Sequence, residues 1–297
     1  MQRALAVPID LHCTTMTAAP IVKWVGGKTS TAQALARVVV SRRPAQRGGR
    51  YIEPFLGGAS VALAVESRTG VPLLLSDLCS PLIATYQAVR AQPEKVHAEL
   101  TGLYDEVGTD AEAYAEVRGY APATFTMIAA RFLYLNALCF NGLYRENSDG
   151  DFNVPFGKRV NPSPRKLEEL VAWADAMKTA EIFLSGFRKA VAAAASGDFV
   201  FADPPYHGTF SNYLADGFTD ADHVDLSTSL QQAYERGADV IVTNADTPFI
   251  RDIYRWAEIR MSDERRSVNR DGAGRGLAPC LLIASSEDLF PDAQVIS

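Results

Sequence analysis

Short apolar runs that alternate with helical stretches constrain the fold of this chain more than any other feature. The helical stretch Thr29–Val40 precedes a short strand that ends at Glu53, and a second apolar run, Val71–Leu75, follows the next helical segment. Such spacing is typical of βαβ units, whose strands run parallel. We therefore expect an α/β fold with a doubly wound parallel sheet and helices on both of its faces.

The pattern changes over residues 81–176, where helical periodicity replaces the strand-like runs. Such runs then return at Glu181–Ser185, Phe199–Ala202, Val240–Thr243 and Leu281–Ala284. We expect a main domain formed by residues 20–80 and 177–297, a mainly helical insertion over residues 81–176, and a loose tail over residues 1–19. A further helix is expected over His223–Arg236, with Thr219 at its start as a cap.

Composition excludes several classes of protein. The 297 residues are 47% hydrophobic and 22% charged, which is typical of a folded globular protein. The richest apolar stretch, Met127–Phe140, carries Arg131 and falls short of the ~18–20 residues that a membrane helix needs. The four cysteines form no C-x-x-C pair, so neither a zinc site nor a disulfide framework is expected. We expect a cytoplasmic monomer without a metal.

The distribution of charge leaves two interpretations open. A net charge of −6 argues against a surface covered in positive charge for nucleic acid. Basic residues nevertheless gather between Arg131 and Lys166 and between Arg251 and Arg275. These segments are either basic faces on an acidic body or solvated loop charges.

The most informative motif is Asp203-Pro204-Pro205-Tyr206, which directly follows the apolar run Phe199–Ala202. Ligands of open parallel sheets bind beyond the carboxyl ends of the strands, so this motif lies where an active site would form. The prolines hold the Asp203 carboxylate and the Pro204 carbonyl as a rigid pair of acceptors, and Tyr206 offers a flat face. This combination suits an amino group on a planar ring. A strand-ending turn with a capping aspartate is the simpler alternative.

A glycine turn, Glu53-Pro54-Phe55-Leu56-Gly57-Gly58, follows an earlier strand. Glycine there lets a ligand approach the backbone. Asp77 ends the next strand, roughly 20 residues further on, where nucleotide-binding sheets hold ribose hydroxyls. The turn lacks the G-x-G-x-x-G spacing, which disfavours a dinucleotide but not a smaller adenosine cofactor.

A third segment, Lys23-Trp24-Val25-Gly26-Gly27-Lys28-Thr29-Ser30, ends like a phosphate-binding loop. That loop requires glycine at position 22, where this chain has Val22, so it could not wrap a triphosphate in the usual way. We therefore disfavour an ATPase.

Taken together, these motifs resemble the Dam family, the D12 class of DNA adenine-N6 methyltransferases, over about residues 20–284. Two further segments carry the resemblance: NGLYRENSDGDFNVPFGK, which is similar to the family's DNA-reading hairpin, and RRSVNRDGAGR. The resemblance implies a Rossmann-like, S-adenosylmethionine-dependent methyltransferase sheet with helices on both faces. It also implies that the helical insertion is a DNA-recognition domain with a β-hairpin.

The resemblance further implies a role for each matching residue. Asp203 and the Pro204 carbonyl would bind the target N6 amino group, and Tyr206 would stack on the base. S-adenosylmethionine would contact Trp24, Gly27, Lys28, Glu53, Phe55, Gly57, Asp77 and Asp203, with Asp77 at the ribose and Glu53, Phe55 and Gly57 at the methionine end. Double-stranded DNA would contact Arg145, Asn147, Pro155, Lys158, Arg159, Arg270 and Arg275. Arg145 and Asn147 have side chains suited to bidentate readout of guanine and adenine.

We therefore expect methyl transfer from S-adenosylmethionine to N6 of an adenine flipped out of a short duplex site, with a GATC-like site as a hypothesis. The alternatives are another amino acceptor, such as RNA adenine, cytosine N4 or a protein glutamine, and a DNA-binding relative without turnover. The chain departs from the family at Gly186, where many members have an acidic residue nearby. The recognition sequence and the biological role stay open at this point.

Overall fold

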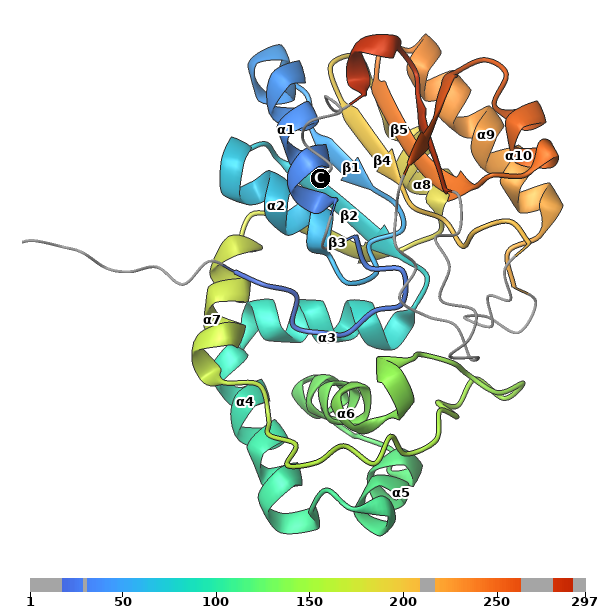
Figure 1. The fold of residues 1–297 in the computed structure, drawn as a ribbon. Coiled ribbons are helices and arrows are strands. Elements are labelled where there is room, and N and C mark those ends of the chain that lie inside the picture. The colour runs from blue at the N-terminus through green and yellow to red at the C-terminus, as the bar shows by residue number, and fades with distance from the viewer. Residues whose placement is uncertain (1–17, 29–30, 209–216, 263–279, 291–297) are drawn as a thin grey trace, which may run out of the picture.

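The chain folds around a seven-stranded sheet with the strand order β3-β2-β1-β4-β5-β7-β6. The computed structural model describes residues 18–28, 31–208, 217–262 and 280–290 (Figure 1). The strands are β1 (Tyr51–Glu53), β2 (Leu73–Asp77), β3 (Glu181–Leu184), β4 (Phe199–Ala202), β5 (Asp239–Ala245), β6 (Glu258–Ser262) and β7 (Cys280–Ala284).

The sheet is mixed, so the expected parallel arrangement applies to five of its seven strands. Strands β1 to β5 pair in parallel, but β7 lies between β5 and β6 and is antiparallel to both. The apolar run at β7 reveals burial but not direction, because central strands of either direction are apolar. Strand β6 was not predicted because it is an edge strand with largely exposed residues and carries no apolar run.

Helices cover both faces of the sheet, as the sequence predicted. Alternate residues of a strand point to opposite faces, and Ile241 belongs to one cluster of buried residues while Val240 and Val242 belong to the other. The first face carries α1 (Ala32–Arg42) and α2 (Ser60–Thr69), and the second carries α8 (Phe187–Ala192), α9 (Asp220–Glu235) and α10 (Pro248–Ile253) (Figure 1).

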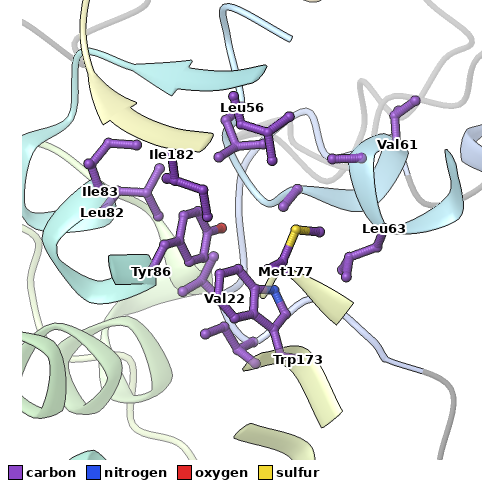
Figure 2. Packing of buried hydrophobic residues seen from close by; sticks show 14 of the residues in the cluster. Val22, Leu56, Val61, Leu63, Leu82, Ile83, Tyr86, Trp173, Met177 and Ile182 are labelled. Atoms are coloured by element: carbon purple, nitrogen blue, oxygen red, sulfur yellow. The ribbon is translucent and has the colours of Figure 1, made fainter. Parts of the chain in front are cut away.

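The segment between β2 and β3 is mainly helical, as expected. Its helices are α3 (Ser80–Ala91), α4 (Pro93–Gly102), α5 (Ala111–Gly119), α6 (Phe125–Leu138) and α7 (Leu167–Ala176), with a π-helical turn at Leu103–Val107. Tyr86 of α3 stacks on Trp173 of α7 with ring centroids 4.8 Å apart. Both residues belong to the same buried cluster as Leu56 and Leu63, so this core is continuous with that of α1 and α2 (Figure 2). The division into separate domains stays a prediction.

The cap predicted for the helix after the tetrapeptide is confirmed. Thr219 Oγ1 accepts from the Asp222 N–H at 3.2 Å, and Asp222 Oδ2 accepts from the Thr219 N–H at 3.1 Å, so the two residues form a capping box that starts α9. In the part of the chain that is described, no helix has both the length and the apolar character to cross a membrane.

Candidate active site and nucleic-acid interface

The tetrapeptide Asp203–Tyr206 lies at the carboxyl end of β4, next to the glycine turn that leaves β1. Strand β1 has β2 on one side and β4 on the other, and β4 continues to β5. The chain winds in opposite directions from β1 and β4, so the pair forms the topological switch point where open α/β sheets bind ligands.

Both carboxylate oxygens of Asp203 have donors. Lys28 Nζ lies 2.8 Å from Oδ2, and the Thr243 hydroxyl donates to Oδ1. Lys28 is buried, and its Nζ also lies 5.0 Å from the centre of the Tyr206 ring. Two predicted motifs, the Lys28 loop and the tetrapeptide, therefore meet at a single carboxylate.

The glycine turn packs closely against Trp24 and Asp77. Gly57 has a left-handed φ of +45°, and a Cβ atom there would lie 2.6 Å from Trp24 Cδ1. Its N–H donates to Asp77 Oδ2 at 2.9 Å, and Asp77 Oδ1 accepts from the Cys79 N–H at 2.9 Å. Burial raises the pKa of Asp77, although these two backbone donors oppose the rise. Position 57 of this turn therefore requires glycine.

Glu53 is an ionisable group in a buried place. Its carboxylate accepts from the Tyr51 hydroxyl at 2.9 Å, and only 3% of its surface is exposed. Burial raises the pKa of Glu53 to about 8, and the charges of Asp203 and Asp77 add to the rise. Glu53 is therefore largely protonated near pH 7, and a positive charge beside it would favour its ionised form.

The neighbouring wall of the site is aromatic. Phe55 stacks on Phe187 at a centroid distance of 5.7 Å and meets the edge of Phe218 at 5.8 Å. Gly186, which precedes Phe187, is the N-cap of α8 and presents no side chain to this region. Apolar contacts rather than a carboxylate from residue 186 therefore surround this end of the site.

Residues of the helical segment hold the Lys23–Lys28 loop in place. The Lys23 N–H donates to Asn136 Oδ1 at 2.8 Å, and Asn136 Nδ2 donates to the Lys23 carbonyl at 2.8 Å. Trp24 stacks on Tyr144 with ring centroids 5.8 Å apart. Gly27 lies in the same loop, where its N–H donates to the Trp24 carbonyl at 3.2 Å.

The predicted hairpin is an antiparallel turn held by two isolated bridges, Cys139 to Phe156 and Glu146 to Phe152, rather than by regular strands. Arg145 Nε donates to Asn153 Oδ1 at 2.6 Å. Asn147 Oδ1 accepts from the backbone N–H groups of residues 149 and 151. In this conformation Asn147 organises the tip of the turn, and its oxygen is already used by the backbone.

The remaining DNA-contact predictions differ in where the structure places them. Pro155, Lys158 and Arg159 are exposed beside the turn, and Lys158 and Arg159 line a pocket with Asp110, the residue that precedes α5. Arg270 and Arg275 lie outside the described residues. Among all the residues that the structure describes, no group of three or more His, Cys, Asp or Glu side chains is arranged to bind a metal ion.

Sequence reasoning missed several residues that shape this site, among them Tyr51, Asn136, Thr243 and Asn244. A usable signal existed for Thr243, because this polar residue ends the apolar run Val240–Thr243, and the carboxyl ends of parallel strands meet at the same side of a sheet. Asn136 offered only the weaker signal of a buried polar residue in an apolar helix.

The mixed seven-stranded sheet with helices on both faces is consistent with an α/β methyltransferase fold. A family model described as D12 class N6 adenine-specific DNA methyltransferase matches residues 24–268. The chain belongs to this family.

Named relatives agree with this assignment. The chain is 36% identical over 271 residues to the retron Ec67 DNA adenine methylase of Escherichia coli, covering 90% of each chain. It is 31% identical over 282 residues to a DNA adenine methylase of Vibrio cholerae, covering 92% of this chain and 98% of the relative. It is 33% identical over 268 residues to the DNA N-6-adenine-methyltransferase of Escherichia phage P1, covering 87% of this chain and 34% of the larger phage protein.

Proposed function

We propose that Asp203, Pro204 and Tyr206 catalyse transfer of a methyl group from S-adenosylmethionine to N6 of an adenine flipped out of a short duplex DNA site. The observation that carries this proposal is the Asp203 carboxylate at the carboxyl end of β4. Lys28 Nζ lies 2.8 Å from one of its oxygens, and the Thr243 hydroxyl donates to the other. A carboxylate held in this way is a directed acceptor for an amino hydrogen.

The residues of the glycine turn fit S-adenosylmethionine. The turn has no side chains at Gly57 and Gly58, where Trp24 packs against the backbone, and Asp77 at the end of β2 has the position of a ribose-binding acid. Glu53 suits the positively charged methionine end, while Trp24, Phe55, Gly27 and Lys28 border the same region. When bound, the cofactor supplies a methyl group already activated by its sulfonium.

The protein's own residues then prepare the acceptor. The adenine N6 lone pair is delocalised into the ring, so the nitrogen is a poor nucleophile until acceptors bind its hydrogens. Asp203 and the Pro204 carbonyl accept these hydrogens, and Asp203 is the acceptor for the proton that N6 loses after transfer. Alignment of the reactants and exclusion of water account for the rest of the rate enhancement.

Stacking on Tyr206 offsets the cost of flipping the base, which is a few kcal/mol. Lys158 and Arg159 contact phosphates. The recognition site is faced by Arg145, Asn147 and Pro155. Two further DNA contacts come from Arg270 and Arg275, which are not among the described residues. Readout of adenine by Asn147 requires its turn to reopen, because both backbone contacts occupy its oxygen.

The test treats unmethylated plasmid DNA with S-adenosylmethionine and either the wild-type protein, Asp203→Ala or the exposed control Asp175→Ala. Sequencing that detects modified bases then reads the product. We expect N6-methyladenine at one short motif with the wild type and the control, and none with Asp203→Ala. Methylation by Asp203→Ala, or modification of cytosine instead of adenine, would refute the proposal.

A further inference from the structure

We propose that Thr243 and Asn244, at the carboxyl end of β5, position the Asp203–Tyr206 segment for methyl transfer. Thr243 orients the carboxylate of Asp203, and Asn244 anchors the backbone that follows Tyr206. The inference rests on the proposed function, because the orientation of Asp203 matters only if this carboxylate receives the target amino group.

Thr243 acts on the carboxylate directly. Its side chain is 3% exposed, and its hydroxyl donates to Asp203 Oδ1. The final torsion of an aspartate side chain is broad, so a carboxylate held by Lys28 alone is free to turn about that one contact. A second donor on the other oxygen sets the plane of the carboxylate, and each oxygen keeps a lone pair for an amino hydrogen.

Asn244 acts on the backbone. It is 0% exposed, and its Oδ1 accepts from the His207 N–H at 3.0 Å and from the Ala245 N–H at 2.8 Å. His207 directly follows Tyr206, so the first bond anchors the end of the tetrapeptide whose ring is proposed to stack on the base. A buried acceptor of this kind is costly to lose, because its donor would stay unpaired.

Two histidines support this anchor. Asn244 Nδ2 lies 3.5 Å from Nδ1 of His223, which is buried. Burial lowers the pKa of His223 to about 4, so its ring is neutral near pH 7 and can accept from the amide. The His207 ring packs against Phe249 at 4.7 Å, and its Nδ1 lies 2.9 Å from Thr247 Oγ1.

The strand geometry explains how two adjacent residues can hold both the Asp203 carboxylate and the backbone of His207. Neighbouring residues of a strand point to opposite faces of the sheet. Ile241 belongs to the cluster beneath α1 and α2, so Thr243 lies on that face, and Asn244 lies with Val242 on the face of α9. The tetrapeptide is therefore held from both faces of the sheet at once.

The test compares Thr243→Val, which keeps the shape and removes the hydroxyl, with Thr243→Ser, which keeps the hydroxyl. Methylation kinetics on unmethylated plasmid DNA are measured together with S-adenosylmethionine binding by calorimetry. We expect Thr243→Val to lower kcat about ten- to a hundredfold, while KM for DNA and the cofactor Kd change less than about twofold. Thr243→Ser should keep kcat within about threefold of the wild type.

Thr85→Val is the matched control. Thr85 is also buried, but it lies on α3 and its hydroxyl donates to the Pro81 carbonyl, so this variant should keep the wild-type kcat. For the backbone anchor, Asn244→Leu removes the acceptor and Asn244→Asp retains it, so kcat should fall much further in the first. Equal losses would overturn the role of Asn244.

Other outcomes separate the inference from the function on which it rests. Wild-type kcat in Thr243→Val, an equal loss in Thr243→Ser, or a loss of cofactor binding parallel to that of kcat would overturn positioning by Thr243. Asp203→Ala is assayed alongside. If it is inactive while Thr243→Val is fully active, only the positioning role fails, and if Asp203→Ala stays active, the proposed function fails.

Discussion

Lys28 Nζ lies 2.8 Å from Asp203 Oδ2, and this ion pair between a buried lysine and a partly buried aspartate joins the loop before α1 to the end of β4. The pair brings together a loop that precedes α1 and a motif that follows β4. The loop is in turn held by Asn136 of α6, so the helical segment, the Lys28 loop and the acceptor carboxylate form one connected structure.

Replacing Lys28 with methionine should slow methyl transfer about a hundredfold, because the Asp203 carboxylate would lose one of the two donors that orient it. Lys28→Arg should recover part of the rate, since it restores a positive donor with a different shape. Single-turnover methylation of plasmid DNA measures the effect. Lys178→Met, an exposed change between α7 and β3, is the control. A rate within twofold of the wild type would contradict the prediction.

The buried carboxyl of Glu53 should make stability depend on pH. Its pKa is about 8 in the folded protein, against an ordinary value of 4.5. Below pH 4.5 the carboxyl is protonated in both states. Between the two pKa values only the unfolded chain releases the proton, so the free energy of unfolding falls by up to about 1.4 kcal/mol per pH unit and levels off above pH 8.

Glu53→Gln should remove this fall, because glutamine keeps the acceptor for Tyr51 but cannot ionise. Urea unfolding of the cofactor-free protein between pH 5 and 9 gives the measurement, with the exposed Glu181→Gln as the control. Parallel pH profiles for the wild type and Glu53→Gln would show that Glu53 is not the group responsible.

Replacing Asn136 with leucine should destabilise the protein by about 1–3 kcal/mol, because the Lys23 N–H and carbonyl would both lose the partner that this buried side chain supplies. Trp24 would also lose its fixed place beside Gly57, so cofactor binding should weaken. Urea unfolding and calorimetry measure the two effects. Gln232→Leu, an exposed change of amide to leucine on α9, should alter neither. Normal stability in Asn136→Leu would disprove the importance of this contact.

Neutralising Lys158 or Arg159 should weaken DNA binding in a salt-dependent way. If each contacts one phosphate, the slope of log K against log salt concentration should become shallower by about 1 in each alanine variant. Fluorescence anisotropy with a labelled duplex at several salt concentrations gives the slopes. Lys178→Ala should retain the wild-type slope. An unchanged slope in both variants would place the phosphate contacts elsewhere.

Local sequence patterns determined much of the fold and the chemical groups of the site. The apolar run Phe199–Ala202 followed by Asp203 predicted a strand with a carboxylate at its end, and the glycines after Glu53 predicted the turn that leaves the first strand. Such predictions succeed because burial and backbone preference act over a few neighbouring residues. The match to the D12 family confirms the activity that these motifs, in their order, implied.

Only the tertiary structure decided which groups meet. The pairing of Lys28 with Asp203, the hydroxyl of Thr243 on the same carboxylate and the support of Lys23 by Asn136 depend on strand order and helix packing. The direction of β7 was equally hidden, since an apolar run looks the same in either direction. The sequence by itself therefore determined the chemical groups at the ends of the strands, while packing between distant segments determined their partners, because contact energies depend on distances that no local pattern encodes.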